Sequence, residues 1–515
     1  MWADNSVFYQ IYPLGFCGAA AVNPQPAGQT SPGAPVSFGA PEGQTYPDAR
    51  RDGIGEPGGI GEPGGTGEPG GTGEPGGIGE PDGTGEPDGI PENGADPSAL
   101  PGDRAAANAA PIRRVMDWTA HIQALGADAV YFCPLLQSDA HGYDTRDFYR
   151  LDVRLGDNAD FQAVCDRLHA AGIRVVLDGV FNHVGRGFWA FQDLLKRRES
   201  SPYKDWFHVD FGGNSPYNDG LWYEGWEGHY ELVRLNLRNP AVVQHILGAV
   251  EQWVRQWDID GLRLDVAYLL DRDFIRQLRA FCDSLNPDFF LVGEMLHGDY
   301  NQLLGEGMLH SVTNYECYKG LYSSFNSLNL FEIGHSLSRQ FGPEDWTLYK
   351  GRRLLCFADN HDVSRVASIL QREAHLPPLY ALLFAMPGIP CVYYGSEWGA
   401  KGRKEEGDPA LRPCFGRPEE KELTRWIARC AAAHKAYPAL WRGDFRVDTL
   451  TNRQLAFLRQ ADGQRILAAV NADEGDYTFH FKVGGRAVNL LDGRAYDLDG
   501  GFCLPPFGAA YLLLE

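Results

Sequence analysis

Apolar runs alternate with amphipathic segments along most of the chain, and this alternation is the strongest signal in the sequence. Apolar residues recur at helical spacing in several segments, which predicts helices over Arg114 to Leu125, Asp160 to Ala171, Pro240 to Trp257 and Glu419 to Lys435. Eight other runs are rich in β-branched and aromatic residues and are predicted to be strands: Val7 to Phe16, Asp128 to Leu136, Ile173 to Val184, Ile259 to Ala267, Phe289 to Met295, His310 to Tyr318, Arg353 to Asp362, and Gly388 to Glu397.

Strands that alternate with helices imply right-handed crossovers and a parallel sheet. Eight such strands that close on themselves form a (β/α)8 TIM barrel, so we expect an α/β protein of this class. A doubly wound open sheet is the alternative. That fold normally carries a Gly-rich phosphate turn after its first strand, and here a long Gly- and Pro-rich insertion occupies this place.

The insertion, residues 20–104, is predicted to be disordered because it offers few large apolar residues to bury. It contains six copies of a Gly-Ile/Thr-Gly-Glu-Pro-Gly/Asp repeat between Gly53 and Asp88, and part of it has Gly at every third position, as collagen does. A collagen triple helix requires three chains, so a flexible acidic loop is favoured. With 14 acidic and 3 basic residues, the insertion carries half of the formal net charge of −22.

Two further regions depart from the strand–helix alternation. Residues 185–236 are irregular and rich in Trp, Tyr, Phe and Gly, which predicts a small excursion domain after the third strand. Residues 436–515 show short strands between turns, over Gln454 to Arg459, Arg465 to Asn471, Tyr477 to Val483 and Ala510 to Leu514, which predicts an antiparallel β-sandwich. The barrel is then assigned to residues 1–19, 105–184 and 237–435.

Composition excludes several classes of partner. An acidic chain is a poor ligand for nucleic acid, whose binding depends on clustered Lys and Arg. The first residues resemble no signal peptide, and no run approaches the ~20 apolar residues of a membrane helix, so we expect a cytoplasmic protein with no membrane partner. The ten cysteines include no Cys-x-x-Cys pair, which favours buried thiols over disulfides or a metal site.

Polar side chains follow several of the predicted barrel strands, at the edge where functional residues of parallel barrels gather. Asp265, Glu294 and Asp362 each follow a strong apolar run, and their convergence would supply the nucleophile and the acid/base of retaining glycoside hydrolysis. Arg263 lies two residues before Asp265 on the same strand face, where it would favour the ionised carboxylate. The other strand-end polar residues are Asp178, Asn182, His183, Asn360 and His361.

Four segments, Asp178 to His183, Gly261 to Asp265, Gly293 to Glu294 and Asp359 to Asp362, resemble the signature regions of the α-amylase family of glycoside hydrolases, in the family's order. The resemblance implies that Asp265 is the nucleophile, Glu294 the general acid and base, and Asp362 the carboxylate that binds sugar hydroxyls. Glu294 would then need a raised pKa, whereas Asp265 would remain ionised. The resemblance further implies a set of substrate-binding residues: His141, Tyr143, His183, Arg263, His361, Arg365, Asp408 and Arg412.

The sequence departs from the family at the site where many secreted members bind calcium. Asn182 is present, but Arg234 stands where the family places an acid, and the segment after Asp265 lacks the usual Lys-His pair. A cation beside Arg234 would be repelled, so we expect no calcium at this site and no cofactor. The same segments look more like those of cyclomaltodextrinases and neopullulanases. Because the chain begins at the first barrel strand, without the amino-terminal sandwich by which those enzymes usually dimerise, the expected oligomeric state stays open.

The predicted partner is a small oligosaccharide. We expect hydrolysis of α-1,4 links in maltooligosaccharides, with cyclodextrins and α-1,6 links as further candidate substrates. Two alternatives stay open: a 4-α-glucanotransferase, which uses the same residues but passes the sugar to another sugar, and a non-catalytic relative that binds glucan.

Overall fold

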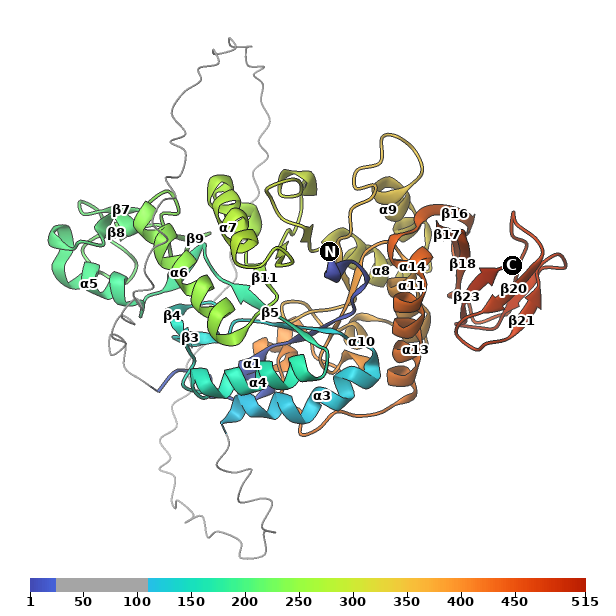
Figure 1. Cartoon of the computed structure of the whole chain (residues 1–515), viewed down its shortest axis with the longest axis horizontal. Helices are drawn as coiled ribbons and strands as arrows, with labels where there is room; N and C mark the ends of the chain where they lie inside the picture. The colour runs from blue at the N-terminus through green and yellow to red at the C-terminus, as the bar shows by residue number, and fades with distance from the viewer. Residues whose placement is uncertain (25–109) are drawn as a thin grey trace, which may run out of the picture. The chain divides into compact units, whose positions relative to one another are not determined.

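The computed structural model describes residues 1–24 and 110–515 (Figure 1). The predicted insertion, residues 20–104, lies outside the described residues except for its first five, so its disorder stays a prediction. In the part of the chain that the structure describes, no helix is long and apolar enough to cross a membrane.

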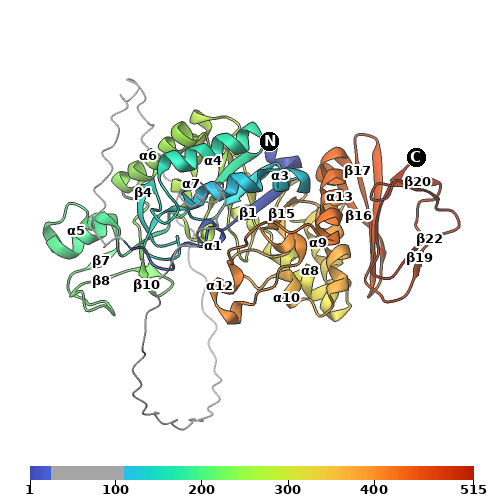
Figure 2. The ribbon, with the colours of Figure 1, turned by 90° about the horizontal axis from the view of Figure 1, so that it is seen from below.

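Eight parallel strands form the barrel, as the sequence predicts (Figures 1 and 2). Their order in the sheet is β13-β12-β11-β5-β2-β1-β15-β14, and a parallel bridge between Thr313 and Leu355 joins the two ends. The strands are β1 (Phe8–Ile11), β2 (Ala129–Phe132), β5 (Arg174–Gly179), β11 (Gly261–Leu264), β12 (Phe290–Gly293), β13 (Ser311–Val312), β14 (Leu355–Phe357) and β15 (Ile389–Tyr393).

The strands are shorter than their apolar runs suggest, because helix-starting residues interrupt several of them. Pro13 begins a short helix, α1 (Pro13–Phe16), and thereby ends β1 at Ile11. The predicted strand from His310 to Tyr318 is a strand only over Ser311–Val312. Asn314 then caps α8 (Tyr315–Ser327) by accepting a hydrogen bond from the Cys317 amide at 3.1 Å.

Helices follow the strands and pack around the barrel. The predicted α3 (Arg114–Leu125) and α6 (Pro240–Trp257) have the expected bounds, and α4 (Asn158–Ala170) begins two residues early because Asp157 caps it. The remaining longer helices are α7 (Arg272–Leu285), α9 (Phe331–Phe341), α11 (Leu376–Ala385) and α13 (Glu422–Ala436), and the short ones include α10 (Val366–Ile369), α12 (Asp408–Leu411) and α14 (Pro438–Arg442).

The region after the third barrel strand is built from short strands. The predicted strand from Ile173 to Val184 is two strands, because the chain leaves the barrel after Gly179 and β6 (His183–Gly185) joins a separate antiparallel sheet. That sheet contains β9 (Gly225–Trp226) and β10 (His229–Arg234). Nearby elements are β3 (Leu136–Ser138), β4 (Thr145–Leu151), α5 (Trp189–Arg197), β7 (Val209–Asp210) and β8 (Trp222–Tyr223).

The C-terminal region is an antiparallel sheet domain, as predicted. Its six-stranded sheet has the order β16 (Asp444–Leu450), β17 (Gln454–Ala461), β18 (Gln464–Asn471), β23 (Ala509–Leu514), β20 (Arg486–Asn489) and β21 (Ala495–Asp497). A two-stranded sheet, β19 (Tyr477–Phe479) and β22 (Phe502–Leu504), shares a separate apolar core with it. Tyr511 donates a hydrogen bond to the Ala381 carbonyl at 2.6 Å and so ties the sheet to α11.

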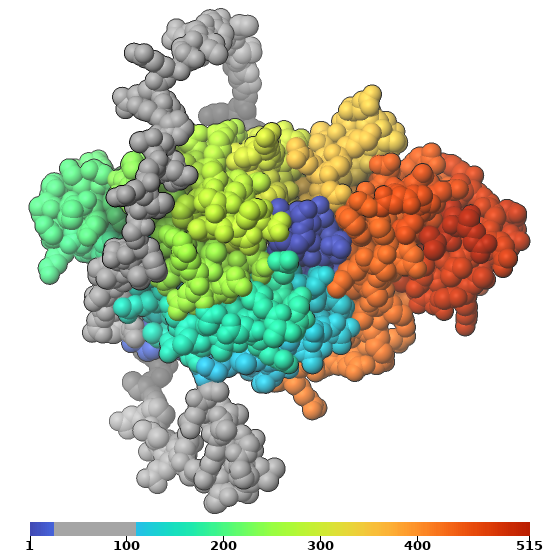
Figure 3. All heavy atoms as spheres, viewed as in Figure 1, coloured from blue at the N-terminus to red at the C-terminus, as the bar shows by residue number. Residues whose placement is uncertain are grey.

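The first residues of the chain pack against distant parts of the barrel domain. In Figure 3 the N-terminal residues form a blue patch at the surface. The Trp2 indole donates to the Asp288 carbonyl at 2.9 Å and stacks on Phe8 with ring centroids 5.8 Å apart. These contacts fix the start of β1.

The packing of Trp253 on α6 against the barrel can be tested by its effect on the free energy of unfolding. Its buried indole stacks on Phe181, with centroids 6.1 Å apart, and donates to the Phe148 carbonyl at 2.8 Å. We predict that Trp253→Ala lowers the free energy of unfolding by about 3–5 kcal/mol, because it leaves a cavity. Trp253→Phe should cost clearly less. Chemical denaturation measures both, and an unchanged stability of Trp253→Ala would contradict the packing described.

Candidate active site

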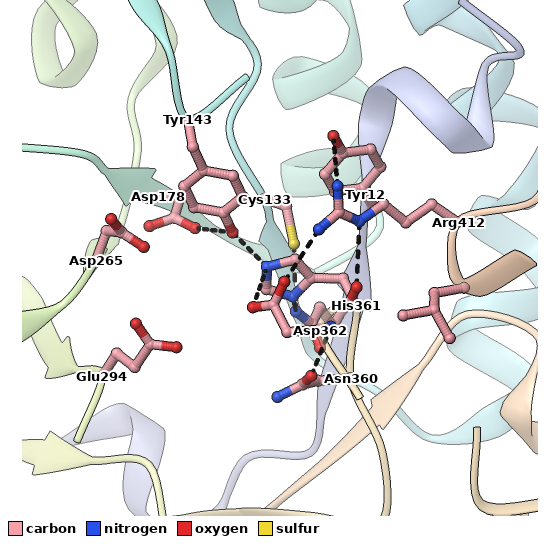
Figure 4. A network of polar contacts seen from close by, with 12 residues as sticks. Tyr12, Cys133, Tyr143, Asp178, Asp265, Glu294, Asn360, His361, Asp362 and Arg412 are labelled. Atoms are coloured by element: carbon pink, nitrogen blue, oxygen red, sulfur yellow. Dashed lines mark hydrogen bonds and ion pairs between the residues drawn. The ribbon is translucent and has the colours of Figure 1, made fainter. Parts of the chain in front are cut away.

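Asp265 and Glu294 come from neighbouring strands and lie side by side at the carboxyl ends of these strands. Asp265 follows β11 and Glu294 follows β12, and the two strands pair in register from Gly261 and Phe290 onward. Each residue is 5% exposed. Figure 4 shows both carboxylates directed toward the space that Asp362 faces from the opposite side.

The Arg263 guanidinium contacts the carboxylates of Asp178, Asp265 and Glu294. Its Nη1 donates to Asp265 at 2.7 Å and to Asp178 at 3.0 Å, and its Nη2 lies 2.6 Å from a Glu294 oxygen. The guanidinium is buried with all three partners. One positive charge thus faces three carboxylates, and a buried net charge of −2 is costly, so the cluster favours holding a proton.

The pKa values of the cluster agree with this charge imbalance. Burial raises the pKa of Asp265 to about 7, although Arg263 acts in the opposite direction. Burial likewise raises the pKa of Glu294, and the charges of Asp265 and Asp362 add to the increase. The increase for Glu294 was predicted. For Asp265 the effect of Arg263 has the predicted direction, but burial outweighs it, so Asp265 and Glu294 compete for a proton.

Val266 supports Glu294 through an unusual backbone conformation. Its φ is +39°, which places a β-branched residue in the left-handed region. The backbone amide of Val266 donates to a Glu294 oxygen at 3.1 Å. Strained residues of this kind persist where the surrounding structure requires them, and here the strain orients an amide toward the candidate acid. The sequence gives no signal for this role.

Asp362 has a different electrostatic environment. Its carboxylate lies 3.0 Å from His361 Nε2 and accepts a hydrogen bond from Arg412 at 3.0 Å. Burial acts to raise the pKa of Asp362, but His361 and Arg412 outweigh it and hold this pKa well below its usual range. Asp362 is therefore ionised in the neutral range.

His361 is fixed by hydrogen bonds at both ring nitrogens. Gln10 Nε2 lies 2.9 Å from His361 Nδ1, and the Tyr143 hydroxyl contacts Nε2. The Tyr143 hydroxyl also donates to Asp178 at 3.2 Å, which connects His361 to the Arg263 cluster (Figure 4). Burial lowers the pKa of His361, and the charge of Asp362 acts in the opposite direction.

His183 lies on the other side of Asp265. Its Nε2 is 3.9 Å from an Asp265 oxygen, is buried, and has no hydrogen-bond partner among the described residues. Burial lowers the pKa of His183 to about 3. A neutral imidazole with a free nitrogen beside the candidate nucleophile suits a sugar hydroxyl, as the sequence predicts. His141 is near, with its ring centroid 6.2 Å from that of Tyr143.

Arg412 and Asp408, which are predicted to clamp a sugar, form an ion pair with each other. Arg412 donates to Asp408 at 2.5 Å, and its guanidinium lies 4.5 Å from the centroid of the Tyr12 ring. Asp408 is exposed, whereas Arg412 is largely buried. Because Arg412 also contacts Asp362, this ion pair borders the candidate catalytic residues.

Two of the predicted substrate-binding residues are held by contacts within the protein. Arg365 is 0% exposed, and it donates to the Tyr394 carbonyl at 2.9 Å and the Leu411 carbonyl at 3.0 Å, so it anchors the segment before Arg412. Arg263 is buried beneath the carboxylates, and its contacts are those of a charge partner. Both guanidinium groups donate to acceptors within the protein, and direct substrate contact by these two residues stays a prediction.

Asp178 is missing from the predicted site residues although it completes the cluster. It accepts hydrogen bonds from Arg263 and, at 3.0 Å, from the Tyr131 hydroxyl. Burial raises the pKa of Asp178 to about 6. Its position at the end of the third predicted strand was the available signal. Gln10 is also missing from the prediction, and nothing in its sequence surroundings marks it.

The fold and the cluster of strand-end carboxylates define a barrel glycosidase. The family model for the α-amylase catalytic domain matches residues 112–435. A cyclomaltodextrinase from Bacillus sp is 32% identical over 385 residues, which cover 72% of this chain and 67% of the relative. An intracellular maltogenic amylase from Bacillus subtilis is 31% identical over 392 residues, which cover 74% of this chain and 64% of the relative.

Solved structures give the same result. The cyclic α-maltosyl-(1→6)-maltose hydrolase from Arthrobacter globiformis aligns with a TM-score of 0.71 at 25% identity, over 100% of both chains. A cyclomaltodextrinase aligns with a TM-score of 0.74 at 26% identity, over 100% of this chain and 78% of the other. The chain belongs to the α-amylase family, and it is a glycoside hydrolase whose relatives act on α-glucans.

The raised pKa values make stability depend on pH. Asp178 and Asp265 bind protons more tightly in the folded protein than in the unfolded chain, so their contribution to stability is complete below about pH 4 and is lost as pH rises through about 6 to 7. We predict that Asp265→Asn raises the melting temperature over that of the parent at about pH 8 and has little effect at about pH 4.5. Thermal scans at both pH values test this, and a lower melting temperature of the variant at the higher pH would contradict it.

Proposed function

We propose that the protein is a retaining hydrolase of α-1,4-glucosidic bonds in maltooligosaccharides. The observation that carries the proposal is that one buried guanidinium, Arg263, contacts both Asp265 and Glu294. This places two carboxyl groups within reach of a single glycosidic bond while leaving too little positive charge to ionise both.

The proposed reaction has two steps, and Asp265 and Glu294 act in both. Glu294 donates its proton to the glycosidic oxygen while Asp265 attacks the anomeric carbon, so the leaving sugar departs with a free hydroxyl and the remaining sugar is bonded to Asp265. Glu294, now ionised, removes a proton from water, and the water oxygen displaces Asp265 from the sugar. Asp362, kept ionised by His361 and Arg412, accepts hydrogen bonds from hydroxyls of the same sugar.

The choice of substrate rests on the relatives. The relatives are named cyclomaltodextrinase, maltogenic amylase and neopullulanase, and on these names we base short or cyclic α-glucans as the substrate proposed here. The protein acts inside the cell. Its ten cysteines are all free thiols, which is usual in a reducing compartment, and one relative is named as intracellular.

The enzyme works without calcium at the family's usual site. Arg234 pairs with Glu224, and on β10 Arg234 lies opposite His183, next to Asn182. The Arg234 guanidinium supplies positive charge at the position where other family members bind calcium. A calcium ion there would be repelled by this charge.

The catalytic roles predict a large loss of activity in two conservative variants. Asp265→Asn and Glu294→Gln should each lower kcat/KM for maltotriose roughly 10³-fold or more, because each removes a group that acts in the transition state. Asp473→Asn, which removes a partly exposed carboxylate of the C-terminal sheet region, is the matched control and should behave as the parent. Near-parental turnover by either variant would exclude the proposal.

The stereochemistry of the first product tests the retaining mechanism separately. Proton NMR during early hydrolysis of maltotriose should show the α-anomer before mutarotation, because two displacements restore the original configuration. A first-formed β-anomer would contradict the covalent route. Products longer than the substrate in excess over hydrolysis products would instead support a glucanotransferase.

The calcium proposal has a direct test. Titration of the parent with Ca²⁺ in a calorimeter should show no stoichiometric binding, and chelator treatment should leave the melting temperature unchanged. Stoichiometric binding that Asn182→Ala abolishes would overturn the proposal.

A further inference from the structure

A two-residue turn between β9 and β10 carries a residue in an unfavourable conformation. Trp226 pairs with His229 across the hairpin, and the turn consists of Glu227 and Gly228. The φ angles of both turn residues are positive, +47° for Glu227 and +89° for Gly228. Turns of this type favour Asn, Asp or Gly at the first position, so a glutamate there costs stability.

No internal contact among the described residues explains a glutamate at this position. Glu227 is exposed, and it forms no hydrogen bond or ion pair within the described residues, so its carboxylate does not offset the strain by an internal contact. A strained residue with an unused charged group is a candidate for ligand binding.

The base of the hairpin joins the turn to the active site. The Trp226 ring lies 5.7 Å from the His183 ring, and His183 Nε2 in turn lies 3.9 Å from Asp265. Trp226 also stacks on His229, with centroids 5.3 Å apart and planes within 24°. This series of rings fixes the turn at the edge of the catalytic cluster.

Tyr268 connects the turn to the side of the site that carries Glu294. Tyr268 follows Asp265 by three residues, and its ring lies 5.9 Å from that of His297, which follows Glu294 by three residues. Burial raises the pKa of Tyr268, and the next contributions come from Glu227 and then Glu294, so the phenol is within electrostatic reach of both. Glu294 is the group that protonates the leaving oxygen, whereas Asp362 and Arg412 contact the opposite side of the space (Figure 4).

We propose that Glu227 binds hydroxyls of the leaving-group sugar, or of the acceptor sugar in the reverse direction, and thereby selects for glucan on that side of the cleaved bond. A carboxylate accepts hydrogen bonds from two neighbouring sugar hydroxyls, and such charge-assisted bonds are stronger than those between neutral groups. The inference rests on the proposed function, because it needs a glycosidic bond cleaved between Asp265 and Glu294.

Two substitutions separate the carboxylate from the strain. Glu227→Gln keeps the unfavourable φ and removes the charge, whereas Glu227→Asn removes the charge and relieves the strain. Both should lower kcat/KM for maltotetraose about tenfold, the loss expected for one charge-assisted hydrogen bond. Glu227→Asn should in addition melt about 1 °C or more above Glu227→Gln.

The comparison substrate is 4-nitrophenyl α-maltoside, in which an aryl group replaces the leaving sugar. Its hydrolysis should be unchanged in both variants within about twofold, because it offers no hydroxyl to Glu227. Glu231→Gln, an exposed change on β10, is the matched control and should behave as the parent on both substrates. Parental kcat/KM of both Glu227 variants on maltotetraose, or an equal loss on the aryl substrate, would overturn the proposal.

A binding measurement keeps this test apart from that of the reaction. In a Glu294→Gln background, titration with maltotetraose should show about tenfold weaker binding when Glu227→Gln is added. Equal affinity would overturn the role of Glu227. Absence of turnover by the parent would instead overturn the proposed function and leave the binding comparison valid.

Discussion

The interaction on which the site depends is the sharing of one buried guanidinium among three carboxylates. Among the residues that the structure describes, Arg263 is the guanidinium that contacts Asp178, Asp265 and Glu294, and its single charge cannot neutralise all of them. The arrangement keeps a proton in the cluster near neutral pH, which acid catalysis by Glu294 requires. It also fixes the positions of the two candidate catalytic oxygens through a single rigid planar group, so position and protonation are set by the same contact.

The barrel makes this sharing possible at short distances. In-register pairing of β5, β11 and β12 brings Asp178, Arg263 and the end of β12 to the same level. The opposite wall works differently: Asp362 is balanced by His361 and Arg412, and is ionised throughout the neutral range. The side of the site around Arg263 therefore has too little positive charge for its carboxylates, whereas the side around Asp362 does not. This asymmetry lets neighbouring acids perform different tasks.

Much of this organisation follows from the sequence. The apolar runs predict the eight strands, and the polar residues that end them predict Asp265, Glu294, Asp362 and their histidine neighbours. Strand bounds were less predictable, because Pro13 and Asn314 start helices inside runs that look continuous. The sequence also cannot distinguish an arginine that contacts substrate from one that anchors a loop. Arg365 follows a His-Asp pair in either case, and its burial depends on carbonyl groups contributed by distant segments. The sequence also does not predict the backbone strain at Val266, because a β-branched residue normally argues against a positive φ.

The most direct test of the account is to trap the covalent intermediate. A fluorinated α-glucosyl fluoride, which forms the glycosyl-enzyme quickly and releases it slowly, should label the protein, and peptide mass spectrometry should place the sugar on Asp265. The label should be absent from Asp265→Asn. A sugar found on another carboxylate, or turnover of the reagent with no labelled intermediate at any pH at which the enzyme is active, would contradict the assignment of Asp265 and the two-step mechanism built on it.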